Sequence, residues 1–300
     1  MVKTERNYNI EFEAIRDLEG FSRKYLRVPD EILLNKKMES NRVALYIYMY
    51  IHKGLNDVVN FSVPLFLSWA GFKSDTHSGG LNDRVLDTLF HLSDLGYITI
   101  IGDKKLTRTS CVEIKFNTDL VEEKCYSGDR FAIVYLDEVD SIIKYKKDNK
   151  KDTVLHSFSI LLVFVYFRRC IPRRPNELKP EERFEDRIID RRNRLPEAYN
   201  GKYIDIAAEL YLGDRTVAKA TEILRKLHLI ALGVPYRIKN IDGEYRTPDF
   251  LFSNCQKRDK GKLLADGKEY AETEIKLKAK QMHEYHKQYG INYSIMEILC

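Results

Sequence analysis

The chain has 300 residues, 44% of them hydrophobic and 32% charged, which excludes a disordered tail and allows one large domain or two ordinary ones. Its formal charge of +5 is mildly basic, which is compatible with a polyanionic partner but does not require one. The five cysteines are widely spaced and form no CxxC pair. This pattern argues against a zinc site or disulfide framework and favours a reducing, cytoplasmic compartment.

No segment is apolar over the length of a membrane helix. The longest apolar run, Val154 to Phe167, has 14 residues. A membrane span needs about 20. The N-terminal MVKTERNYNIEF carries charges where a signal peptide has an apolar core. We therefore expect no membrane association and interpret the run as a buried helix.

A first set of elements is predicted from the N-terminal third of the chain. Lys24 to Leu33 is extended, and a helix runs from its expected N-cap Ser40 to Gly54. Asn60 to Phe72 indicates an extended pair and then a short helix with a proline in its first turn. Apolar residues every three or four positions from Leu81 to Gly96 predict a third helix. Two strands follow, separated by a polar loop.

The same order then returns. The second set begins with an extended segment (Ile133–Ile142), a charged linker (Lys144–Asp152) and a helix capped by Asp152 (Asp152–Arg169). A short helix (Lys202–Asp214) and a third helix (Arg215–His228) follow. Two strands, Leu229–Asn240 and Glu244–Asn254, are joined at Asp242-Gly243. Apolar positions recur 132 residues apart, pairing Val85, Leu92, Leu95 and Ile98 with Val217, Leu224, Leu227 and Ile230. Tyr25 aligns with Tyr135 at a separation of 110, and Gly71 with Gly213 at 142. This pattern indicates one plan used twice.

Helix, short helix, turn, third helix and β-hairpin is the order of a winged helix. We predict an α+β, mainly helical fold with two tandem winged-helix domains, each a helix-turn-helix plus a β-hairpin, and a C-terminal helical tail. We expect an N-terminal extension at 1–20 and the first domain at 21–128. The second domain, with an Arg-rich insertion at 170–200, is expected at 129–255, and the charged tail at 256–300. In such modules the third helix enters the major groove of DNA and the wing reaches the backbone. Winged helices also serve as protein–protein modules, so that alternative stays open.

One stretch resembles a known family. The run RVPDEILLNKKMESNRVALYIYMYIHKG, with VNFSVPLFLSWAGF and LNDRVLDTLFHLSDLGYI, resembles N-terminal winged-helix segments of replication-associated proteins of Firmicutes plasmids, phages and conjugative elements. The tandem arrangement resembles two-winged-helix plasmid replication initiators that bind origin repeats. The likeness covers roughly residues 20 to 255, and the insertion and the tail depart from it. It implies that each winged helix covers one half of a DNA site and that the third helices read bases.

The outward faces of the third helices and the wings carry the candidate contacts. Expected base-reading residues are Ser78, Asn82, Arg84, Arg215, Thr216 and Lys219, since Arg pairs with guanine and Asn with adenine. Expected phosphate contacts are Lys104, Lys105, Arg108, Arg168, Arg169, Arg173, Arg174, Arg191, Arg192, Arg237, Lys239 and Arg246. Asp83 and Asp87 on the third helix of the first set would repel phosphate. The third helix of the second set is therefore the better candidate for reading DNA bases.

Most of the net charge lies in the insertion. From Arg168 to Arg194 the sequence contains ten Lys or Arg residues and six Asp or Glu residues. Nine of the ten basic residues are Arg, which binds phosphate in a bidentate way. The alternative is a solvated helix with ion pairs four residues apart.

No catalytic or metal motif is present. The chain lacks GxxxxGK[ST], HExxH and GxSxG, and HEYH at His283 does not have the spacing of two ligands on one helical turn. We predict a non-enzymatic double-stranded DNA-binding protein, without cofactor or metal, that initiates or organises replication of a mobile element. A transcription regulator, a replisome interaction scaffold and a metal-dependent nuclease remain alternatives. Host replication proteins are further expected partners, and the apolar Ser294 to Leu299 is a candidate for self-association or for docking on the same chain.

Overall fold

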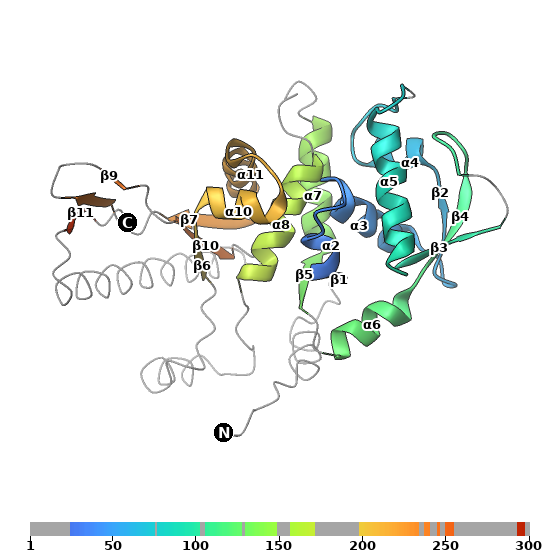
Figure 1. The fold of residues 1–300 in the computed structure, drawn as a ribbon, viewed down its shortest axis with the longest axis horizontal. Helices are drawn as coiled ribbons and strands as arrows, with labels where there is room; N and C mark the ends of the chain where they lie inside the picture. The colour runs from blue at the N-terminus through green and yellow to red at the C-terminus, as the bar shows by residue number, and fades with distance from the viewer. Residues whose placement is uncertain are drawn as a thin grey trace.

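The computed structural model describes residues 25–75, 77–102, 106–127, 130–148, 157–171, 198–233, 237–240, 245–246, 250–254 and 293–297. Helices and small antiparallel sheets make up these residues, as Figure 1 shows. The predicted α+β class is therefore confirmed.

The first half is built from short strands and helices, and three of its strands form a sheet of their own. Its elements are β1 (Tyr25–Pro29), α2 (Asp30–Leu33), α3 (Arg42–His52), β2 (Val58–Phe61), α4 (Val63–Trp69), α5 (Leu81–Asp94), β3 (Ile98–Ile101), β4 (Val112–Phe116) and α6 (Thr118–Tyr126). Strands β2, β4 and β3 form an antiparallel sheet with β4 in the middle. Val112, Ile114 and Phe116 on β4 are buried, and the residues between them are exposed, so one face of this sheet covers the core.

Local signals explain the start of α4 and correct the start of α3. The Ser62 hydroxyl accepts a hydrogen bond from the Leu65 amide at 3.4 Å, and the proline lies in the first turn as predicted. The predicted N-cap Ser40 is wrong, because α3 begins after Asn41. The Asn41 side chain does not cap the helix, since its oxygen accepts from Thr88 on α5 at 2.6 Å.

The second half repeats the order of the first. Its elements are β5 (Phe131–Tyr135), α7 (Leu136–Asp148), α8 (Ser157–Cys170), β6 (Ala198–Gly201), α10 (Tyr203–Leu210), α11 (Asp214–Lys226), β7 (Ile230–Gly233), β8 (Arg237–Asn240), β9 (Tyr245–Arg246), β10 (Phe250–Asn254) and β11 (Tyr293–Glu297). Strands β6, β10 and β7 form an antiparallel sheet with β10 in the middle, the place that β4 has in the first half. Both halves share the order helix, strand, short helix, long helix and strand. In the first half β4 then follows β3 directly, whereas in the second half β8 and β9, which belong to another sheet, stand between β7 and β10.

The long helices α5 and α11 end in the same way. After α5, Gly96 has a φ of +79° and the Tyr97 amide donates to the Leu92 carbonyl at 3.0 Å. After α11, His228 has a φ of +55° and the Leu229 amide donates to the Leu224 carbonyl at 2.9 Å. The positive φ reverses the chain direction and closes the helix end. The predicted separation of 132 residues is thus confirmed for the helix ends and for β3 and β7.

Two other predicted correspondences are wrong. The short helices α4 and α10 also end in matching bonds, from Phe72 to Leu67 at 2.8 Å and from Leu212 to Ala207 at 2.9 Å. These bonds pair Gly71 with Tyr211, both at positive φ, whereas Gly213 is the N-cap of α11. Tyr25 begins β1 and Tyr135 ends β5, so these two residues face each other across an antiparallel ladder.

The two halves share one core. β1 pairs with β5 from Tyr25 opposite Tyr135 to Pro29 opposite Phe131, so each half supplies one strand. Helix α8 is buried on all sides from Ser157 to Arg168. Figure 1 shows α8 in the centre, between α10 and α11 on one side and α3 and α5 on the other. A helix that is apolar all round is a core element, which is what the apolar run predicted.

The remaining predictions meet the structure only in part. Helix α7 continues to Asp148, so the first residues of the predicted linker are helical, and Lys146 is buried. Around the predicted Asp242-Gly243 turn, β8 and β9 pair antiparallel. Near the C-terminus, β11 pairs with β8, so Ser294 to Glu297 docks on its own chain. The cap Asp152, the extension at 1–20, the insertion between 172 and 197 and the tail helix lie outside the described residues.

Candidate nucleic-acid interface

Helix α11 presents a row of charged side chains to solvent. Arg215, Lys219, Glu222 and Lys226 are exposed and lie three or four residues apart, so they share the face opposite the buried Val217, Ala220 and Leu224. We call these four exposed residues the α11 stripe. Thr216, beside the stripe, is half-buried, and its amide donates to the N-cap Gly213 carbonyl at 2.9 Å. The three predicted base-reading residues of this helix therefore lie together in its first two turns.

The two ends of the α11 stripe differ in charge balance. At the C-terminal end, Lys226 lies 2.8 Å from Glu222, and this bond lowers the pKa of the Glu222 carboxyl. At the N-terminal end, Arg215 and Lys219 have no ion-pair partner within 4 Å in the described part of the chain. The cations of the α11 stripe without such a partner thus lie at its N-terminal end, where Asp214 is the acidic residue of the first turn.

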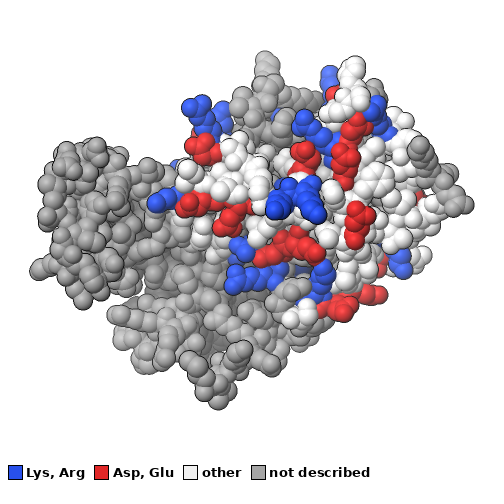
Figure 2. Space-filling view, in the orientation of Figure 1, with Lys and Arg blue, Asp and Glu red and all other residues white. Residues whose placement is uncertain are grey.

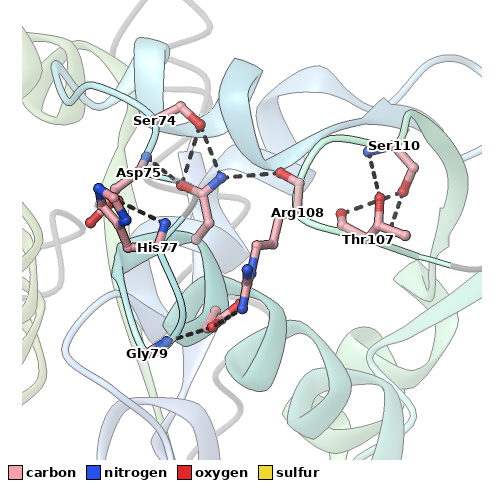
Figure 3. A network of polar contacts seen from close by, with 9 residues as sticks. Ser74, Asp75, His77, Gly79, Thr107, Arg108 and Ser110 are labelled. Carbon is pink, nitrogen blue, oxygen red and sulfur yellow. Dashed lines mark hydrogen bonds and ion pairs between the residues drawn. The ribbon is translucent and has the colours of Figure 1, made fainter.

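Asn82, on the equivalent helix α5, is not available for reading bases. It is fully buried, and its oxygen accepts from the Asp75 amide at 2.8 Å while its nitrogen donates to the Arg108 carbonyl at 3.1 Å. A hydrogen bond to Ser74 completes its set of partners. Figure 3 shows the labelled partners, which come from the segment before α5 and from the loop between β3 and β4. The prediction for Asn82 is wrong, because the segment before α5 and the loop between β3 and β4 enclose its side chain.

Arg108 is also occupied inside the protein. Its guanidinium makes two parallel bonds with the Asp83 carboxylate, one of them 2.7 Å from Nη2 to Oδ2, and that carboxylate also accepts from the Gly79 amide at 2.7 Å. The Arg108 guanidinium, followed by the Gly79 amide, holds the pKa of Asp83 below its usual value. Arg108 can reach a phosphate only if this pair opens. Ser78 and Arg84 are exposed, as predicted.

Arg168 and Arg169, predicted as phosphate contacts, lie inside the fold instead. Arg168 forms a buried ion pair with Glu138 on α7. Arg169 lies 2.8 Å from Asp30 at the start of α2, and its side chain is 18% exposed. Both predictions are wrong, because acidic residues distant in sequence reach the end of α8. The signal for them was an acidic pair in the first turn of the helix after β1 and of the helix after β5, Asp30-Glu31 and Asp137-Glu138.

The other predicted phosphate contacts are not tested by the geometry. Lys104, Lys105, Arg173, Arg174, Arg191 and Arg192 lie outside the described residues. Arg237 and Lys239 belong to β8, and Arg246 to β9, which form the hairpin with β11 at its edge. Only the backbone of these three residues is described.

The exposed faces of α5 and α11 carry opposite charges at equivalent positions. At the separation of 132 residues, Asp83 corresponds to Arg215, Asp87 to Lys219 and Asp94 to Lys226. Over the described residues on the face in Figure 2, basic and acidic side chains are interspersed and form no large patch of one sign. Any nucleic-acid contact in this part of the chain therefore depends on local clusters such as the first turns of α11.

Other classes of site find no support within the described ranges. There, no group of three or more His, Cys, Asp and Glu could hold a metal ion, and Cys111, Cys125 and Cys170 are free thiols. None of the helices in the described part of the chain is long and apolar enough to cross a membrane. No family model, curated protein or solved structure matches this chain.

Proposed function

We propose that the chain is a non-enzymatic, sequence-specific double-stranded DNA-binding protein built from two winged helices. The observation that supports this proposal is the repeated order of helix, strand, short helix, long helix and strand, followed in each half by a later strand, β4 or β10, that takes the middle place in a three-stranded sheet. In that arrangement the long helix is the one that enters the major groove. The long helices here are α5 and α11.

Helix α11 is the main reading helix. Arg215 and Lys219 are exposed cations on its first turns, and Thr216 lies beside them. An Arg bidentate to guanine supplies base discrimination, while a Lys supplies phosphate attraction and a point-like donor. Arg84 and Ser78 give α5 a secondary role, because Asn82 and Arg108 are engaged inside the first half.

The biological role that we propose is initiation or organisation of replication of a plasmid, phage or conjugative element. It rests on the resemblance of the tandem arrangement to plasmid replication initiators. Host replication proteins are partners in this proposal. The acidic α5 face, with Asp87 and Asp94 around the 45% exposed Phe90, favours a second candidate function in which the first half contacts a protein.

Footprinting on the genetic element that encodes the chain tests the proposal. Protected repeats at a replication origin are expected for an initiator. A single protected operator at a promoter would assign the chain to transcription regulation instead. Absence of any protected sequence, together with capture of a replisome protein by α5, would assign it to the scaffold class.

A further inference from the structure

Helix α3 of the first half and helix α8 of the second half each bond the end of the short helix in the other half. Arg42 begins α3 in the first half, and its Nη2 donates to the carbonyl of Leu210, the last residue of α10, at 3.3 Å. Ser157 begins α8 in the second half, and its hydroxyl donates to the carbonyl of Ala70, the C-cap of α4, at 2.9 Å. Both donors are buried. We call this pair of contacts the reciprocal clasp.

The clasp acts where the chain turns into the long helices. The last carbonyls of a helix have no partner inside the helix, so an outside donor stabilises that end. Helices as short as α4, with 7 residues, and α10, with 8, have little stability of their own. Leu210 directly precedes the short turn that leads to α11, and Ala70 precedes the longer segment of residues 71–80 that leads to α5. The orientation of each long helix therefore depends on a side chain of the opposite half.

Arg42 is suited to this role by its geometry. Its Nε and Nη2 donate to the Leu33 carbonyl at 3.0 and 2.9 Å, and its Nη1 donates to the Met38 and Glu39 carbonyls. Burial lowers the pKa of Arg42 to about 10, so the guanidinium stays protonated at neutral pH. A planar fork can serve several carbonyls at once, whereas a lysine ammonium is point-like and cannot.

Apolar and ionic contacts across the halves surround the clasp. Phe158 on α8 stacks on Phe66 and Phe72 of the first half, with ring centroids 5.5 and 4.6 Å away. Arg169 on α8 pairs with Asp30 on α2. With the β1–β5 ladder, these contacts join the described parts of the two halves at several separate points.

We propose that the two halves form one rigid reading unit, in which Arg42 and Ser157 are positioning residues that hold α11 and α5 at a single separation. The DNA target is then two blocks of bases at one fixed spacing. The statement about DNA rests on the proposed function, and the statement about rigidity does not.

The distance between α5 and α11 tests rigidity without DNA. Spin labels are placed at Asp87 and Glu222, both exposed, through a ketone-bearing amino acid, because the chain has five cysteines. Double electron–electron resonance of the full chain is expected to give one narrow distance distribution. The variant Arg42→Lys should widen it by about twofold, since the fork is lost. A broad or bimodal distribution in the unsubstituted chain overturns the proposal.

Two further variants keep the test decisive. Thr88→Val is the matched control, because Thr88 is a buried hydroxyl whose partners, Asn41 and Arg84, both belong to the first half. It should leave the distribution narrow, and widening equal to that of Arg42→Lys would overturn the role of the clasp. Should Arg42→Lys fail to fold, Ser157→Ala, which removes a single hydroxyl, takes its place with the same expected widening.

A spacing series tests the DNA target. Duplexes selected from a random library should share two blocks at one spacing, and inserting half a turn or a full turn of DNA, about 5 or 10 base pairs, should weaken binding by about tenfold or more. Enrichment of several spacings, or recovery with the full-turn insertion, would show that the halves move independently. If no duplex is enriched, the proposed function fails, and the spin-label distances alone decide on the rigid unit.

Discussion

Arg168 and Glu138 form an ion pair inside the core, with side chains 2% and 4% exposed. The pair joins the start of α7 to the end of α8. The Glu138 carboxylate also accepts a hydrogen bond from the Tyr135 amide at 3.3 Å. A buried charge that loses its partner is costly, although the intact pair need not be more stable than an apolar replacement.

Removing one partner of this pair should therefore destabilise the fold strongly. Glu138→Gln is expected to lower the free energy of unfolding by about 3–5 kcal/mol, measured by urea denaturation. Replacing both side chains by methionine should recover much of that loss, because no charge is then left alone. A neutral effect of Glu138→Gln would mean that Arg168 is solvated, as a phosphate contact would be.

Asn82 should behave as a structural residue. Asn82→Ala removes the partners of the Asp75 amide and the Arg108 carbonyl, and should cost about 1–3 kcal/mol of unfolding free energy. The base preference of the protein should not change. Arg84→Ala is the control, because Arg84 lies two residues later on the same helix and is exposed, so its stability should change by less than about 0.5 kcal/mol. A stable Asn82→Ala variant with altered base preference would restore Asn82 as a reader.

Much of the fold follows from patterns within the chain. Apolar spacing gave the long helices, and the 132-residue repeat marked where each one ends. Such signals are local and depend on side chains a few positions apart. The class of the fold and the buried α8 could be predicted for this reason.

The site was harder to predict, because contacts with residues distant in sequence determine whether its polar side chains are buried or exposed. The apolar spacing of α5 places Asn82 off the buried stripe, and it is the contacts with Ser74, Asp75 and the Arg108 carbonyl that enclose it. Arg168 and Arg169 follow an apolar run, but their acidic partners Glu138 and Asp30 lie 30 and 139 residues earlier. Arg42 falls within the helix predicted from Ser40 to Gly54, and its carbonyl partners cannot be inferred from the sequence.

The first turns of α11 should carry DNA discrimination. Arg215→Ala is expected to lose about 1–3 kcal/mol of discrimination at one base pair of the selected site. Lys226→Ala is the matched control on the same stripe, and it should have little effect because Glu222 already offsets that charge. Competition assays with single-base variants of the site measure both. Equal losses for the two variants would indicate general charge attraction rather than reading by the first turns.

The turn before α5 should respond to acid through Asp83. Folding lowers the pKa of this carboxyl below its ordinary value of 3.8, chiefly because Arg108 hydrogen-bonds it. Its contribution to stability is therefore complete above the ordinary pKa and is lost as the pH falls through the lowered one. The Gly79 amide resonance, followed by NMR, should shift in that acidic window, whereas Asp83→Asn should abolish the shift. A shift centred above the ordinary pKa would contradict the ion pair.

Binding of the full chain to a random-sequence DNA duplex, followed by fluorescence anisotropy across a salt series, tests DNA binding most directly. We expect log affinity to fall linearly with log salt, with a slope of about −0.9 per phosphate contacted. The double variant Arg215→Ala/Lys219→Ala should weaken binding and flatten the slope. Undetectable or salt-insensitive binding at low salt would contradict the proposed DNA interface and point to a protein partner.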